Sequence, residues 1–102
     1  MPRITQTFSH SLGKDEAVRR LREKISIEKV NKQNVATVTK EVWQDPYNLE
    51  FSMTVLTYRV DGSLNIGDSE ITLNIDLPMG ALLFKGMIES QIQQQMNLML
   101  AK

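Results

Sequence analysis

Alternation of apolar and polar side chains predicts most of the β-structure. In residues 49–55, 58–66 and 71–77, a hydrophobic residue recurs at every second position and polar residues fill the gaps. This period is typical of a strand with one buried face. Residues 3–9 are rich in β-branched and aromatic side chains, and residues 38–43 in Val and Thr, which favours two further strands. Short links between consecutive strands predict antiparallel neighbours.

Turn residues separate these strands. Asp45-Pro46-Tyr47-Asn48 has Pro at the second position of a turn, and Gly67-Asp68-Ser69 is typical of a hairpin. Gly62 lies inside a predicted strand, so we expect either a bulge or a close approach of another group there. Residues 32–39 have the weakest pattern, and only a turn at Gln33-Asn34 is predicted within them.

Helical spacing of apolar residues predicts two helices. The first runs from Lys14 to about Asn31, with Asp15 and Glu16 near its start, where negative charge is favourable. The second follows Pro78 and runs from about residue 80 to residue 101 as one amphipathic helix of about six turns. The apolar arc of this second helix comprises Phe84, Met87, Ile88, Ile92, Met96, Leu98 and Met99.

Composition predicts a soluble single domain covering residues 1–102. Hydrophobic residues make up 41% and charged residues 24% of the chain, as in ordinary globular proteins. The absence of cysteine excludes a disulfide framework, a thiolate zinc site and a cysteine nucleophile. The longest apolar run, residues 81–84, is too short to span a bilayer. Residues 1–20 hold no apolar signal core, so a cytoplasmic protein is expected.

Charge is balanced over the chain but not along it. Residues 1–40 hold nine bases and four acids, a net charge of +5, whereas residues 41–102 hold three bases and eight acids, a net charge of −5. This split could orient the protein on an anionic surface or on a second copy of itself, or the charges could simply be solvated. A homodimer is one expectation, and Leu56 and Trp43 on the polar sheet face would favour it.

Catalytic chemistry is poorly represented. His10 is the only histidine, and a single histidine beside a strand-to-helix turn is more typical of a capping or packing residue than of a base. The sequence has no metalloprotease helix, nucleophile elbow or phosphate loop. We therefore predict no enzyme, no catalytic residue, no cofactor and no metal site. A net charge of zero and few aromatic residues argue against nucleic-acid binding.

Two surfaces are candidates for contact with a partner. Arg19, Arg20 and Arg22 form the only basic cluster. Four of the six methionines lie in the last quarter of the chain, where they either fill the core or form an adaptable apolar surface. Gln91 and Gln95 fall within the apolar arc, at its rim or facing a cavity or a second subunit. The candidate contact residues are Arg19, Arg20, Arg22, Met87, Met96 and Met99.

Three segments together resemble a known family. His10-Ser11-Leu12-Gly13, followed by Asp15-Glu16-Ala17 and Arg19-Arg20-Leu21, is similar to the opening of the polyhydroxyalkanoic acid system proteins, or polyhydroxyalkanoate granule region proteins. Residues 60–64 resemble the central strand of that family. Leu77, Leu82-Leu83, Lys85-Gly86, Ile88-Glu89 and Ile92 resemble its closing segment. The resemblance implies a bacterial protein of the storage-granule system, and it implies no activity or catalytic residue.

These observations lead to one fold and two functional hypotheses. We expect an α+β fold: an antiparallel sheet of about five strands, a helix after the first strand, and a long C-terminal helix on one face, as in a reduced helix-grip fold. In an alternative arrangement, the sheets of two chains pair or stack. The first functional hypothesis is a non-enzymatic protein that contacts the granule surface or a granule-associated protein. The alternative is a small apolar-ligand binding protein, with a cavity of ~300 Å³ or more between the sheet and the long helix.

Overall fold

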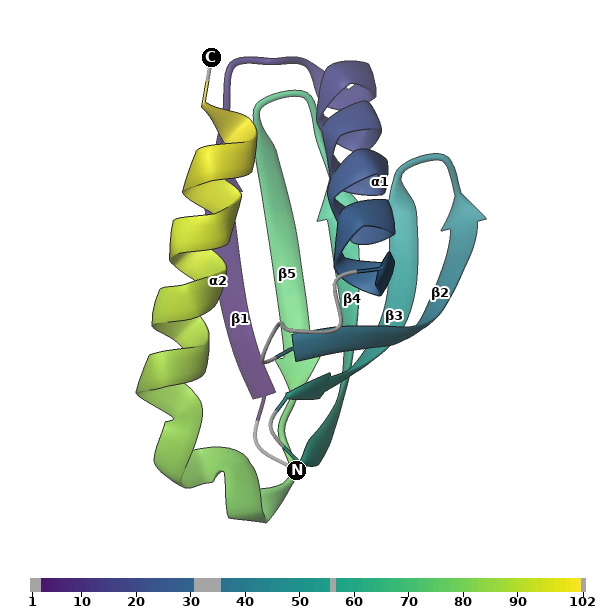
Figure 1. Cartoon of the computed structure of the whole chain (residues 1–102). Coiled ribbons are helices and arrows are strands. Elements are labelled where there is room, and N and C mark those ends of the chain that lie inside the picture. Colours follow the sequence, from purple (N-terminus) through teal and green to yellow (C-terminus); the bar gives the residue numbers. More distant parts are fainter. Residues whose placement is uncertain (1–2, 31–35, 56, 102) are drawn as a thin grey trace.

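The structure, a computed structural model, describes residues 3–30, 36–55 and 57–101 of the chain. In order, the elements are β1 (Arg3–Ser9), α1 (Lys14–Val30), β2 (Ala36–Asp45), β3 (Asn48–Val55), β4 (Tyr58–Ile66), β5 (Glu70–Asp76), the 3-10 helix η1 (Met79–Phe84) and α2 (Lys85–Leu100). The strands form one antiparallel sheet in the order β1-β5-β4-β3-β2. Both α-helices lie on the same face of this sheet (Figure 1). The predicted α+β fold is therefore confirmed.

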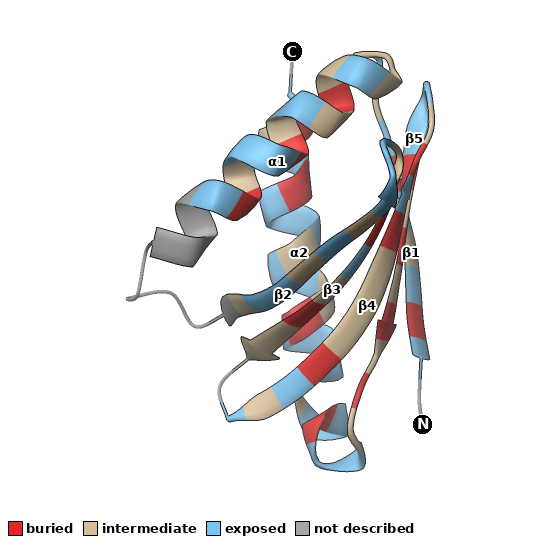
Figure 2. Ribbon diagram, turned by 90° about the vertical axis from the view of Figure 1, so that its right-hand side faces the viewer, coloured by how far each residue is buried: buried red, intermediate tan, exposed pale blue. Residues whose placement is uncertain are grey.

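The chain crosses the sheet twice on its helical side. β1 is one edge strand and β2 is the other, and α1 connects them across the face of the sheet (Figure 1). α2 follows β5 and runs back over the side of the sheet that holds β1. The two helices therefore lie side by side over the same face, and the opposite face has no helix on it (Figure 2).

The register places every predicted apolar row on the helical face. In β5, Ile71, Leu73 and Ile75 are buried and alternate with partly exposed polar residues. Ile75 lies opposite Ile4 of β1, and Leu73 opposite Leu64 of β4. Side chains on directly opposed residues share a face, so these rows form one core beneath the helices. The alternation seen in the sequence thus fixed which face is buried.

The connector between β1 and α1 is held by the turn between β4 and β5. The Leu12 backbone N–H donates to His10 Nδ1 at 3.2 Å, and His10 Nε2 donates to the Gly67 carbonyl at 3.0 Å. Gly13 has a φ of 80°, a conformation that favours glycine, and its carbonyl accepts the N–H of Ala17 in the first turn of α1. The ring of His10 thus joins the connector to the turn between β4 and β5, and its role as a capping or packing residue stays a prediction.

The C-terminal segment differs from the single long helix that was predicted. A 3-10 helix, η1, covers Met79–Phe84, and the α-helix begins only at Lys85. Ala81 is fully buried and its N–H donates to the Pro78 carbonyl, while Gly80 lies directly against the Tyr58 ring. These contacts hold the first turn tightly against the end of the sheet, which a wider α-helical turn starting at Pro78 would disturb.

Two further predictions about side chains were wrong. Leu98 is 69% exposed, because the buried stripe of α2 continues through Met96 and Leu100 instead. Trp43 lies opposite Leu49 on the apolar side of the sheet and packs against the core, so it does not belong to the polar face. Leu56, the other residue expected to favour a dimer there, lies outside the described residues, as do Gln33 and Asn34 of the predicted turn. Self-association stays a prediction.

Candidate functional site

An apolar groove of about 400 Å³ lies between the two α-helices and the sheet. Its floor comes from the three central strands and from Val38 of β2, and its walls come from α1 and α2. The lining residues are Leu21, Lys24, Ile25, Val38, Leu49, Phe51, Met53, Leu64, Leu73, Ile75, Met87, Ile88, Gln91, Ile92, Gln95 and Met96. The volume falls within the range of small-molecule sites. The cavity predicted by the ligand-binding hypothesis is thus present, although it is open to solvent at its rim.

A glycine shapes the floor of the groove. A Cβ atom on Gly62 would lie 2.6 Å from Phe51 Cζ and 2.7 Å from the Asn74 carbonyl oxygen. The Phe51 ring therefore lies over the backbone of Gly62, its direct partner in the neighbouring strand. The register around Gly62 is continuous, so of the two predicted roles, the close approach is observed and the bulge is not. The aromatic ring covers the position where a side chain is missing.

The rim of the groove is polar where the two helices approach each other. Lys24 Nζ of α1 donates to Gln95 Oε1 of α2 at 2.6 Å. Gln91, one turn earlier on α2, is exposed and lines the same groove. Both glutamines are therefore at the rim, which was the favoured alternative. Lys24 is the only charged residue among the described residues that line the groove.

The three candidate methionines of α2 differ in their surroundings. Met96 is buried and Met87 is 44% exposed, and both line the groove. Met99 is partly buried and packs against the core beyond the groove. The groove thus has one methionine at each end of its α2 wall, about 13 Å apart at 1.5 Å per helical residue. Thioether side chains of this kind adapt to ligands of different shape.

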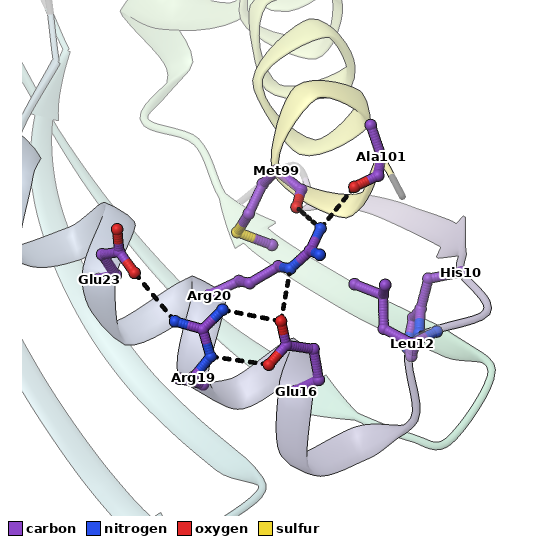
Figure 3. Close-up of polar contacts among 8 residues, drawn as sticks. All are labelled: His10, Leu12, Glu16, Arg19, Arg20, Glu23, Met99 and Ala101. Atoms are coloured by element: carbon purple, nitrogen blue, oxygen red, sulfur yellow. Dashed lines mark hydrogen bonds and ion pairs between the residues drawn. The ribbon is translucent and has the colours of Figure 1, made fainter.

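The basic cluster is engaged within the molecule. Glu16 accepts hydrogen bonds from Arg19 at 2.7 and 2.8 Å and from Arg20 at 2.9 Å (Figure 3). These bonds from the two guanidinium groups lower the pKa of Glu16 to about 2. Arg20 also donates to the carbonyls of Met99 and Ala101 at the end of α2, where a cation is favourable. Arg20 therefore ties the start of α1 to the end of α2.

Arg22, the third member of the cluster, lies over the Trp43 ring, with its guanidinium carbon 4.0 Å from the ring centroid. This cation–π contact joins α1 to the edge strand β2. The Trp43 indole N–H donates to Glu41, so the ring is also held from its own strand. Of the two arginines that bind Glu16, Arg19 is the more exposed to solvent.

A second apolar surface protrudes at η1, and we call it the η1 tip: Met79, Leu82 and Leu83. Met79 is 76% exposed, Leu83 is 90% exposed, and Leu82 is less so. The tip is held from below by buried Ala81 and by the contact of the Phe84 and Tyr58 rings, whose centroids are 6.2 Å apart. The sequence pattern did not identify the η1 tip, because a run of apolar residues predicts burial. Which residues of the run are exposed depends on how η1 packs against the end of the sheet.

The opposite face of the sheet carries a polar hollow of about 370 Å³. Arg3 donates to Asp76 at 2.9 Å, and Ser52 and Arg59 both donate to Asp61, at 2.6 and 3.2 Å. The hydrogen bond from Ser52 lowers the pKa of Asp61, and that from Arg3 lowers the pKa of Asp76. Four of the six charged residues that line this hollow are thus paired with one another, as Arg3 with Asp76 and Arg59 with Asp61.

Among the described residues, His10 and the acidic side chains are the usual groups for binding a metal ion or transferring a proton. No group of three or more His, Asp and Glu side chains there could hold a metal ion. Both ring nitrogens of His10 are engaged in the connector, away from the groove. No helix among the described residues is long and apolar enough to cross a membrane.

Comparison with known proteins gives one match. A family model described as "putative polyhydroxyalkanoic acid system protein" matches residues 4–100. This range includes both α-helices, the five strands except Arg3 of β1, and all described lining residues of the groove. No curated protein and no solved structure matches the chain.

Proposed function

Because the chain belongs to the family of putative polyhydroxyalkanoic acid system proteins, we propose that it serves this system as a non-enzymatic protein that binds an apolar group in its groove. The observation that carries the proposal is the groove itself. Its described lining is apolar apart from Lys24, Gln91 and Gln95. On its floor Val38, Phe51 and Met53 are only half-buried. Exposed apolar surface of this kind is stabilised when a ligand removes it from water.

The chemistry of the lining supports binding rather than catalysis. Its described residues provide alkyl chains, thioethers, one aromatic ring, two amides and one ammonium group. General acid–base catalysis needs a titratable pair placed to exchange protons with a substrate, and no carboxylate is among the described lining residues. Storage polyesters and their precursors are rich in alkyl groups, so an apolar binding site suits the system that the family name denotes.

A groove-filling substitution tests this proposal. Ile92→Trp places an indole in the groove wall of α2, whereas Leu98→Trp places the same side chain on an exposed part of the same helix. We expect the wild-type protein and Leu98→Trp to bind a neutral apolar dye such as Nile red with similar affinity. We expect Ile92→Trp to bind it at least about tenfold more weakly, because the indole occupies the site. Fluorescence titration measures this, and equal binding by all three proteins would contradict the proposal.

A second candidate function is attachment to the granule surface, in the cytoplasm, and the η1 tip favours it. Its exposed aliphatic side chains are held rigidly at one end of the molecule, and Lys85 follows directly. An apolar tip next to a basic residue is suited to an amphiphilic surface that carries anionic lipid. This attachment needs no enzyme and leaves the groove free.

Fractionation of granule-bearing cells on a density gradient tests the attachment. We expect part of the wild-type protein to sediment with the granules. Leu83→Asp should move the protein to the soluble fraction, while Leu98→Asp, an equally polar change at another exposed leucine, should not. If the wild-type protein stays entirely soluble while granules are abundant, the attachment proposal is wrong and the groove proposal is unaffected.

A further inference from the structure

The polar groups at the rim of the groove indicate which apolar molecule it takes. We infer that the groove binds a single alkyl chain with a carboxylate head, the head lying at Lys24 and Gln95 and the tail running along α2 toward Met87. This inference rests on the proposed binding function and adds the chemical class of the ligand.

The charge of the site selects the head group. Lys24 is the only charged side chain among the described lining residues, and it is a cation. Its Nζ already donates to Gln95 Oε1 at 2.6 Å, so the ammonium group is held at the rim and points across the gap between the helices. A carboxylate oxygen at this point would accept a charge-assisted hydrogen bond from Lys24. An anionic head is therefore complementary, whereas a cationic head would be repelled.

The shape of the site selects a linear tail. The walls of the groove are two helices that lie side by side (Figure 1), and the α2 wall extends from Met87 to Met96. Between Met87 and Gln95 the helix advances about 12 Å at 1.5 Å per residue. The floor residues that are only half-buried, and so can contact a tail, are Val38, Phe51 and Met53. An extended alkyl chain fits such a slot, and each methylene that it buries strengthens binding about fourfold.

The amide of Gln91 adds a hydrogen-bonding group at the rim that a fatty acid without a hydroxyl group would not use. Gln91 lies one helical turn from Gln95 and lines the same rim. An amide can donate to and accept from a hydroxyl group. A hydroxyl near the carboxylate end of the ligand, as in a hydroxyalkanoic acid, would lie within this polar rim. Alkanoates with and without a hydroxyl group share the carboxylate head and the alkyl tail that we infer for the ligand.

The test compares matched ligands on the full chain by isothermal titration calorimetry. Decanoate and its uncharged methyl ester have the same tail, and both are used below their aggregation limits. We expect the wild-type protein to bind decanoate at least about tenfold more tightly than the ester, which is the effect of one charge-assisted hydrogen bond. Affinity should rise about fourfold per methylene from hexanoate to octanoate and decanoate.

Variants of Lys24 assign the preference to this residue. In Lys24→Met, which keeps the apolar stem, we expect decanoate to bind as weakly as the ester, with ester binding unchanged. Lys24→Arg should retain the preference for the acid. Lys85→Met removes an exposed lysine outside the groove and should behave as the wild type. Circular dichroism before titration shows that each variant is folded.

The outcomes separate this inference from the proposed function. If the acid and the ester bind equally well to the wild type, or if Lys24→Met keeps the preference, the inference is wrong and apolar binding stands. If neither ligand binds, the proposed function itself is wrong. Tighter binding of 3-hydroxydecanoate than of decanoate would identify a hydroxyalkanoate as the ligand, and equal binding would identify a plain alkanoate. Either result supports the carboxylate class.

Discussion

The two faces of the sheet carry hollows of similar size and opposite chemistry. The helical face holds the apolar groove, of about 400 Å³, and the open face holds the polar hollow, of about 370 Å³. In the polar hollow, Arg3, Asp76, Ser52 and Asp61 satisfy one another by hydrogen bonds. In the groove, aliphatic side chains line a space that none of the described residues fills. The two hollows are therefore alike in size, and the apolar lining of the groove is what supports the binding function that we propose for it.

The two faces of the sheet also differ in the interactions that stabilise them. Apolar groups in the groove floor contribute through burial, which grows with the area removed from water. The paired charges of the polar hollow are partly exposed, and exposed ion pairs contribute little. Substitutions on the two faces of one strand should therefore differ greatly in how much they lower the free energy of unfolding.

The largest effect is expected from truncating the groove floor. Leu73→Ala removes a buried side chain of β5, so the free energy of unfolding should fall by about 2–5 kcal/mol. Thr72→Ala, the adjacent position on the polar face, should cost less than about 1 kcal/mol. Urea denaturation followed by circular dichroism measures both. Similar losses at the two positions would show that the faces do not differ in the way described.

A smaller effect is expected from adding one methyl group at a glycine. Gly62→Ala places a Cβ 2.6 Å from Phe51 Cζ and 2.7 Å from the Asn74 carbonyl, so it should destabilise the fold by about 1–3 kcal/mol through overpacking. Gly86→Ala in α2 meets nothing within 4 Å and should be stabilising by up to about 1 kcal/mol. Thermal denaturation of the two variants compares them. If Gly62→Ala leaves the melting temperature unchanged, the Phe51 ring is free to move away from the backbone of β4.

The smallest effect is expected from acid, and it acts on the polar hollow. Asp61 and Asp76 have folded-state pKa values below the ordinary value of 3.8, because Ser52 and Arg3 donate hydrogen bonds to the ionised carboxylates. Their contribution to stability is therefore complete above pH 3.8 and is lost as the pH falls through the lowered pKa values. The groove floor contains no titratable group among its described residues.

Urea unfolding midpoints measured from neutral pH downward test this assignment. The double variant Asp61→Asn/Asp76→Asn should lose less stability below pH 3.8 than the wild type, and its midpoint should already be somewhat lower at neutral pH. Glu16, whose pKa is lowered from 4.5 to about 2 by Arg19 and Arg20, adds a further loss over that range in both proteins. An unchanged pH profile in the double variant would assign the acid sensitivity to other groups.

The sequence by itself determined the sheet and its faces. Alternation in residues 71–77 identifies the buried row of β5, because a period of two allows only one assignment of faces once one face is apolar. The turns at Pro46 and Gly67, and the helix beginning at Lys14, are also local signals that depend on few residues.

Only the tertiary structure decided the groove, the engagement of the arginines and the break before α2. The groove exists because α1 and α2 leave a space between them above the sheet. Helix placement depends on contacts such as those of Arg20 with the end of α2, 79 residues or more away along the chain. Likewise, Leu83 and Leu98 are apolar residues in helical patterns, yet both are exposed. Periodicity reports which residues are apolar on each element. Which of them become buried depends on where the elements meet.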